Sequence, residues 1–214
     1  MQKIQTSIGL IMFKPYDFSN PKPINKEIAK ENLLLFQKIM NRHNISFSLA
    51  YGTLLGAIRE NDFITHDEDI DVAILDEDRQ KLIDSLHDFI KNDFSIGRYE
   101  KDLLSVFRKD EYIDIYIFRK KPFGYRQFNN EVLKEKYLLN TIKYDFKDSQ
   151  FNIPKEYISY LKDHYGEDWK KPVKNSHACN PSLYLKIKTL IQKHAKPLFK
   201  ILSKVKKAIN DDNK

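Results

Sequence analysis

Asp67-Glu68-Asp69-Ile70-Asp71 places four carboxylates within five residues, directly before the apolar run Val72-Ala73-Ile74. This pattern predicts a strand over residues 69–74 whose first residues are acidic. Alternate residues of a strand point to one face, so Asp69 and Asp71 would project together, with Asp67 approaching from the preceding loop. Neighbouring carboxylates resist ionisation beside one another. A hard divalent cation, magnesium or manganese, relieves that repulsion, so the stretch favours a metal site.

Two other structures are compatible with an acidic stretch. A solvated acidic loop is the first, and the residues by themselves leave it open beside the metal site. A calcium loop of the EF-hand kind is the second, because the aspartates stand at alternate positions. Such a loop needs glycine where this chain has Val72, and a bidentate glutamate where it has Asp78. The calcium loop is therefore rejected.

Asp114 is a third carboxylate with the potential to join this site. It lies within Tyr112-Ile113-Asp114-Ile115-Tyr116-Ile117, a predicted strand that is otherwise apolar or aromatic. A carboxylate inside such a strand needs a partner. Neighbouring strands lie about 5 Å apart, so Asp114 would complete the site if its strand pairs with residues 69–74. An edge-strand aspartate that faces water is the alternative, and Asp114 alone does not decide between the two.

A Gly-Thr pair upstream of the acids is suited to binding phosphate. Residues 45–50 predict a short strand, and residues 53–59 predict a short helix with Thr53 near its N-cap. Free backbone N–H groups at the start of a helix bind phosphate, and Gly52 allows an anion to approach closely. Arg59 would reach the same anion or pair with a neighbouring acid. A phosphate site beside a metal site is the arrangement that phosphoryl transfer requires.

Helices and strands alternate around these candidate residues. Apolar residues recur at helical spacing over residues 24–43, 76–90 and about 155–164. Residues 103–108 and 112–118 predict two strands joined by a tight turn. We expect an irregular lead-in over residues 1–23, which contain three prolines, and residues 120–150 give no clear pattern. This order predicts an α/β or α+β domain whose mixed sheet is flanked by helices.

Three parts of the chain resemble the LicD family, which includes bacterial phosphocholine transferases and is related to fukutin and fukutin-related protein. The first is the long block Gly52-Thr53-Leu54-Leu55-Gly56-Ala57-Ile58-Arg59, then Phe63-Ile64, then Asp67-Glu68-Asp69-Ile70-Asp71-Val72. Ile113-Asp114-Ile115 is similar to a later strand of the family that bears an aspartate. Tyr165-Gly166-Glu167-Asp168-Trp169, with Pro172, is similar to its C-terminal Tyr-Gly motif. His66 and Glu68 depart from a frequent Trp and Asp of the family, but the Asp-x-Asp pair is intact.

The resemblance implies a nucleotidyltransferase-like fold and a metal-dependent phosphotransferase. Such an enzyme would move a phospho-alcohol, such as phosphocholine, from a CDP-linked donor to a hydroxyl of a cell-surface glycan: lipopolysaccharide, teichoic acid or capsule. The expected partners are this CDP-alcohol donor and a glycan or lipid-linked glycan acceptor. The resemblance implies that Asp69, Asp71 and Asp114 are catalytic and bind Mg²⁺ or Mn²⁺, with Asp114 as ligand or base. It also implies that Gly52, Thr53 and Arg59 contact the donor phosphates.

Other functions are compatible with the same residues. A nucleotidyltransferase would use the same carboxylates and leave a nucleoside monophosphate on its acceptor. A sugar transferase with an Asp-x-Asp motif usually has a larger nucleotide-binding half before that motif, whereas one predicted strand precedes it here. A membrane-associated scaffold with an inert acid cluster would bind no metal. The full set of carboxylates argues against the scaffold.

The positive charge is concentrated near the C-terminus. The 214 residues have a net charge of +7, and residues 183–209 contain eight lysines and no Asp or Glu. The remainder is close to neutral, which argues against a nucleic-acid-binding face. We expect a catalytic domain over residues 1–182 and a basic amphipathic helical tail over residues 183–214. The tail would lie on an anionic membrane surface or dock on the domain.

Composition also indicates the compartment. Cys179 is the single cysteine, which excludes an internal disulfide and a cysteine-based zinc site. No apolar run has the length to cross a bilayer, and the first residues lack the features of a signal peptide. We therefore expect a cytoplasmic protein, peripheral at the inner face of the cell membrane if its tail contacts lipid.

Overall fold

The structure is a computed structural model and describes residues 1–172. Its centre is a nine-stranded mixed sheet in which seven strands follow the order β10-β11-β3-β4-β7-β6-β5, while β8 pairs with β7 and with β9. The strands are β3 (Ser48–Leu49), β4 (Ile70–Leu75), β5 (Ser95–Tyr99), β6 (Leu103–Arg108), β7 (Glu111–Lys121), β8 (Tyr125–Phe128), β9 (Glu131–Lys134), β10 (Thr141–Phe146) and β11 (Ser149–Pro154). The mixed sheet predicted from the sequence is thus confirmed.

The two central strands, β4 and β7, run parallel and place Asp71 beside Asp114. Their outer neighbours, β3 and β6, are antiparallel to them. Ile70, Val72 and Ile74 alternate with the acids and belong to the buried core. The alternation of a strand therefore separates the acidic face of β4 from its core face.

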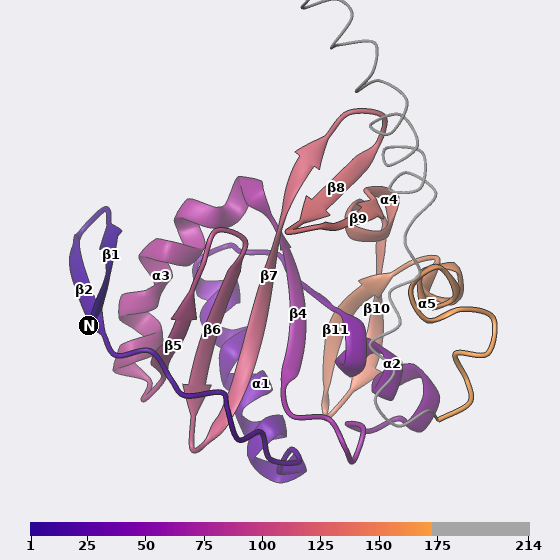
Figure 1. Cartoon of the computed structure of the whole chain (residues 1–214), viewed down its shortest axis with the longest axis horizontal. Helices are drawn as coiled ribbons and strands as arrows, with labels where there is room; N and C mark the ends of the chain where they lie inside the picture. Colours follow the sequence, from indigo (N-terminus) through magenta and orange to yellow (C-terminus); the bar gives the residue numbers. More distant parts are fainter. Residues whose placement is uncertain (173–214) are drawn as a thin grey trace, which may run out of the picture.

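Helices cover both faces of the sheet (Figure 1). Behind the sheet in that view lie the longer helices α1 (Lys26–Arg42) and α3 (Arg79–Lys91). The short 3₁₀ turn η1 (Asp76–Asp78) directly precedes α3. On the acidic face lie α2 (Tyr51–Glu60), whose first turn contacts Asp71, and α5 (Tyr157–Tyr165), with the short helix α4 (Lys136–Leu139) nearby. The Asn25 side chain caps α1 by accepting a hydrogen bond from the backbone N–H of Ile28. None of the described helices has both the length and the hydropathy needed to span a membrane.

The prediction of an irregular lead-in over residues 1–23 is wrong for its first half. The strands β1 (Gln2–Thr6) and β2 (Gly9–Phe13) form an antiparallel hairpin beside α3. Alternate residues of β2 are buried, but Leu10 and Met12 on its outer side are 52% and 53% exposed. Because the outer side is apolar as well, the period-2 pattern of a strand was not visible in the sequence.

Other predicted elements differ from the structure at their ends. The strand expected over residues 45–50 is reduced to the two residues of β3, and α2 begins two residues earlier than the predicted helix. Residues 120–150, which gave no clear pattern, contain β8, β9, α4 and β10. The predicted tail over residues 183–214 and its boundary with the domain lie outside the described residues.

Candidate active site

Asp67, Asp69 and Asp71 form a compact group, called here the acid cluster, at the N-terminal end of β4. Each offers one carboxylate oxygen, and these three atoms lie within 4.8 Å of one another. Asp69 lies one residue before β4, and its carboxylate converges with that of Asp71, as expected from their spacing. Asp67 joins them because two backbone hydrogen bonds hold its loop. The Asp67 N–H donates to Ile64 O at 3.0 Å, and the Ile24 N–H donates to Asp67 O at 2.8 Å.

The first turn of α2 closes one side of the acid cluster. The Gly52 N–H donates to Asp71 Oδ2 at 2.9 Å, and the Asp71 N–H donates to Thr53 Oγ1 at 2.8 Å. A Cβ atom on Gly52 would lie 2.2 Å from Asp67 Oδ2, so the close approach requires glycine. Tyr51 has φ of 38°, an unfavourable conformation for an aromatic residue that is typical of functional sites. Gly52 and Thr53 thus bind Asp71 directly, and their contact with a donor phosphate stays a prediction.

Asp114 lies on the central strand β7 and is 4% exposed. The alternative of a water-facing aspartate on an edge strand therefore does not apply. Its carboxylate accepts hydrogen bonds from Ser105 Oγ and from Arg98 Nη2, the latter at 2.6 Å. Neither donor was predicted from the sequence as a site residue. The role of Asp114 as ligand or base stays a prediction.

Arg59 lies in the last turn of α2, roughly 10 Å along the helix axis from Gly52. Its Nε and Nη2 atoms both donate to Glu60 Oε1, at 3.1 and 2.5 Å. The pairing with a neighbouring acid, one of the two outcomes considered for this residue, is the one present in the structure.

The acid cluster disfavours negative charge on its own members. Burial, with the nearby carboxylates of Asp67 and Asp114, raises the pKa of Asp71 to about 8, although Tyr116 donates a hydrogen bond to it at 2.9 Å. Burial and the same crowding raise the pKa of Asp69 well above its ordinary value. Three converging hard oxygens that resist ionisation form a donor set that fits a divalent cation. The acid cluster is consistent with a metal site on these grounds.

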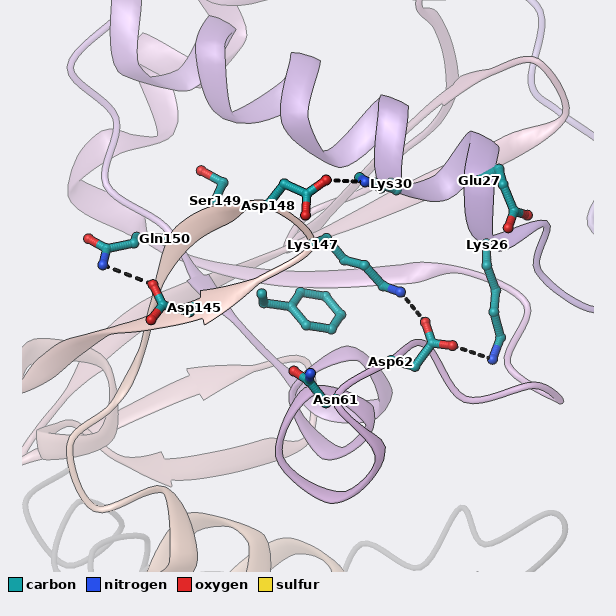
Figure 2. Close-up of a pocket in the computed structure, with 11 residues that line it drawn as sticks. Lys26, Glu27, Lys30, Asn61, Asp62, Asp145, Lys147, Asp148, Ser149 and Gln150 are labelled. Carbon is teal, nitrogen blue, oxygen red and sulfur yellow. Dashed lines mark hydrogen bonds and ion pairs between the residues drawn. The ribbon is translucent and has the colours of Figure 1, made fainter.

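A polar cavity of about 750 Å³ lies elsewhere, between the start of α1, the loop after α2 and the β10–β11 turn (Figure 2). Its three lysines are neutralised, since Lys26 and Lys147 both pair with Asp62 and Lys30 pairs with Asp148. No residue of the acid cluster lines this cavity. The cavity therefore contains none of the site residues predicted from the sequence.

Comparison with known families matches residues 44–159, more than half of the chain, to the family described as "LicD/FKTN/FKRP, nucleotidyltransferase domain". The chain belongs to the LicD/fukutin family. The matched residues include the first turn of α2, the acid cluster and Asp114, so the LicD resemblance inferred from the motifs is confirmed over the whole candidate site.

Two curated relatives of the LicD/fukutin family illustrate the similarity. The ribitol-5-phosphate transferase FKTN of Homo sapiens is 30% identical over 161 residues, covering 70% of this chain and 34% of that protein. The lipopolysaccharide cholinephosphotransferase LicD of Haemophilus influenzae is 45% identical over 49 residues, covering 23% of this chain and 18% of that protein. The chain thus spans about a third of the length of the fukutin relative.

Two solved structures overlap with part of this LicD/fukutin family fold. The lincomycin-bound lincosamide antibiotic adenylyltransferase LnuA has a TM-score of 0.46 at 13% identity, covering 67% of this chain and 97% of that chain. The enzyme ANT(2")-Ia, in complex with adenylyl-2"-tobramycin, has a TM-score of 0.43 at 14% identity, covering 62% of this chain and 77% of that chain.

Proposed function

We propose that this LicD/fukutin family member transfers a phospho-alcohol from a CDP-linked donor to a hydroxyl of a cell-surface glycan. The observation that carries the proposal is the convergence of three carboxylates against Gly52, inside the residues that match the family. The names of two relatives, a ribitol-5-phosphate transferase and a lipopolysaccharide cholinephosphotransferase, support the class of group transferred. The acceptor would be lipopolysaccharide, teichoic acid or capsule, free or linked to lipid.

The acid cluster would hold Mg²⁺ or Mn²⁺ in this proposal. A bound cation would neutralise the donor phosphates and polarise their oxygens. Gly52 and Thr53 fix the position of Asp71, and Tyr116 donates a hydrogen bond to its other carboxylate oxygen. These contacts orient the cluster before any donor binds, which reduces the reorganisation that the reaction needs.

The proposed reaction is a substitution at the phosphorus atom that bears the alcohol. The acceptor hydroxyl oxygen forms a new bond to this phosphorus, and the bond between the phosphorus and the oxygen shared with CMP breaks. CMP leaves with that oxygen, and Asp114 accepts the hydroxyl proton. Burial raises the pKa of Asp114, although Arg98 and Ser105 oppose the shift, and a carboxylate with a raised pKa is a stronger general base.

Turnover of candidate donors, followed by mass spectrometry, tests the proposed function. The full chain with Mg²⁺ or Mn²⁺ would be offered CDP-choline, CDP-ethanolamine, CDP-glycerol and CDP-ribitol, with nucleoside triphosphates and nucleotide sugars as competitors. We expect metal-dependent CMP release from one CDP-alcohol. The release should disappear in the double variant Asp69→Ala, Asp71→Ala and persist in Asp93→Asn, which changes an exposed aspartate at the end of α3.

Nucleotidyl transfer is the second candidate function, because the matching family is described by its nucleotidyltransferase domain. Pyrophosphate release from a nucleoside triphosphate, with a nucleoside monophosphate added to the acceptor, would favour it over phospho-alcohol transfer. An inert scaffold would release neither product and would bind no metal at the acid cluster.

A further inference from the structure

Arg98 ends a row of polar side chains that crosses four strands of the sheet. The strand register places Arg98 opposite Ser105, Ser105 opposite Asp114, and Asp114 beside Asp71. The Arg98 side chain extends along this row, with Nε donating to Ser105 Oγ at 3.0 Å and Nη2 donating to Asp114 Oδ2 at 2.6 Å. Its guanidinium therefore lies at Asp114, about one strand spacing of roughly 4.8 Å from the strand that bears Asp71.

A β-bulge in β5 turns Arg98 toward the acid cluster. Ile96 pairs with Val106 and Arg98 with Ser105, so β5 has one residue more than β6 between these pairs. Val106 and Ser105 are consecutive and point to opposite faces of the sheet. Without the bulge, Arg98 would share the core face with Ile96. Bulges beside active sites commonly re-aim a side chain in this way.

The segment between β2 and α1, residues 14–25, is called here the strap, and it crosses β5, β6 and β7 (Figure 1). The Tyr16 N–H donates to Gly97 O at 2.8 Å, which ties the strap to the bulge. The Phe18 ring lies against Arg98, whose Cζ is 4.6 Å from the ring centroid. The same ring packs edge-on against Tyr112 at 5.1 Å. The strap therefore holds one face of the guanidinium through a cation–π contact.

One nitrogen of this guanidinium remains available for a ligand. Nη1 has no hydrogen bond or ion pair within residues 1–172, and the Arg98 side chain is 28% exposed. Arg59, by contrast, uses two of its nitrogens on Glu60. A planar guanidinium is well suited to phosphate oxygens, and this one is already oriented by Ser105, Asp114 and Phe18.

We propose that Arg98 binds the diphosphate of the donor through Nη1, beside the acid cluster. The inference rests on the proposed function, because it assigns the diphosphate to a donor bound at that site. Arg98 would supply a fixed positive charge on one side of the diphosphate, and the acid cluster with its cation would lie on the other. The bulge and the strap are then the devices that position this charge.

Equilibrium binding of Mn²⁺ alone, then of inorganic pyrophosphate and of CDP at saturating Mn²⁺, tests the proposal on the full chain. We expect Arg98→Gln to keep Mn²⁺ binding and to lose affinity for both anions by about tenfold or more, because a hydrogen bond to a charged group is lost. The anion affinity of Arg98→Lys should lie between those of the wild type and Arg98→Gln, since lysine keeps the positive charge but lacks the planar guanidinium. The matched control Arg42→Gln, an exposed arginine of α1 paired with Asp88, should bind like the wild type.

Unchanged pyrophosphate affinity in Arg98→Gln would overturn the proposal, and so would a wild type that does not bind pyrophosphate. Loss of both Mn²⁺ and pyrophosphate binding in Arg98→Gln would also overturn it, because that result indicates a purely structural role for Arg98. If Arg98→Gln does not fold, Phe18→Leu decides, because it removes the ring contact and leaves Asp114 untouched. Unchanged pyrophosphate affinity in that variant also contradicts the proposal. A wild type that binds pyrophosphate but not CDP refutes the CDP-linked donor of the proposed function, while a loss of pyrophosphate affinity in Arg98→Gln still supports diphosphate binding by Arg98.

Discussion

Carboxylates that converge without a counterion destabilise a folded chain, and the acid cluster, with Asp71 buried and Asp67 and Asp69 partly buried, is such a group. A cation that binds there should therefore stabilise the protein. We expect Mn²⁺ to raise the melting temperature of the wild type and to leave that of Asp69→Asn and Asp71→Asn unchanged. The variant Asp93→Asn should respond like the wild type. Differential scanning fluorimetry with and without Mn²⁺ measures the effect, and an equal rise in all four proteins would place the cation elsewhere.

The raised pKa of Asp71 predicts how stability depends on pH in the absence of metal. Its ordinary value is 3.8 and its folded value is about 8, so the folded state favours the protonated carboxyl. This contribution is fully present below the ordinary value and is lost as the pH rises through about 8. Melting temperatures in a chelator should fall from about pH 5 to about pH 9. The fall should be smaller in Asp71→Asn, and identical slopes in the two proteins would contradict the assignment.

Among the site residues, those whose position depends on local alternation were predictable from the sequence. The shared face of Asp69 and Asp71 follows from the two-residue period of a strand. Arg98 was not predictable, because its orientation depends on a bulge that reverses this period. The pairing of Asp114 with Asp71 was only one of two alternatives until the parallel register of β4 and β7 was known.

At the scale of elements, two glycines of α2 provide a matched pair of substitutions. A Cβ on Gly52 would meet the side-chain carboxylate of Asp67 at 2.2 Å, whereas a Cβ on Gly56 would meet the backbone carbonyl of Asp62 at 2.5 Å. We expect Gly52→Ala to fold stably, with Asp67 displaced and Mn²⁺ affinity reduced about tenfold or more. Gly56→Ala should instead lose about 1–3 kcal/mol of stability, because backbone must move.

Chemical denaturation and Mn²⁺ titration of both glycine variants separate these effects. The helix propensity of alanine favours each variant by roughly 0.5–1 kcal/mol, so it does not explain a difference between them. A loss of stability in Gly52→Ala with unchanged metal affinity would show that Gly52 serves the fold and not the acid cluster.

Elements with a single apolar stripe were predictable, and elements without one were not. Buried residues of α1 and α3 recur at helical spacing, and both helices were predicted close to their observed ends. Of the hairpin strands, β2 was missed because apolar residues lie on both of its sides, and β1 because it contains a single buried apolar residue, Ile4. The predicted short strand over residues 45–50 is shortened to β3, whose pairing depends on distant strands.

At the scale of the whole molecule, the candidate site is assembled from segments that are far apart in the sequence. The strap donates a hydrogen bond to the carbonyl of Asp67, α2 closes the cluster, and β5 and β7 supply Arg98 and Asp114. No local pattern specifies such an arrangement, because it depends on the order of strands in the sheet. The long first motif of the LicD resemblance covers most of α2 and the acid cluster, whereas Arg98 and Asp114 come from strands outside it.

The uneven distribution of charge leads to a prediction about the predicted tail, residues 183–214, which lie outside the described residues. Its lysines would attract an anionic bilayer, each contributing about 1 kcal/mol near the surface. We expect the full chain to co-sediment with phosphatidylglycerol vesicles and not with neutral phosphatidylcholine vesicles. A variant in which four lysines of the tail are changed to glutamine should bind these vesicles about tenfold or more weakly. The four lysines are Lys196, Lys200, Lys204 and Lys207.

A matched control replaces four exposed lysines of the described domain, and this variant should sediment like the wild type. The control positions are Lys38, Lys91, Lys101 and Lys155. Equal loss in both variants would mean that overall charge, and not the tail, governs the interaction. Raised salt should release the wild type from the vesicles, because ions screen the attraction between lysines and lipid phosphates. Binding by the tail would bring the protein to the membrane surface, where a glycan acceptor linked to lipid would be available for the proposed reaction.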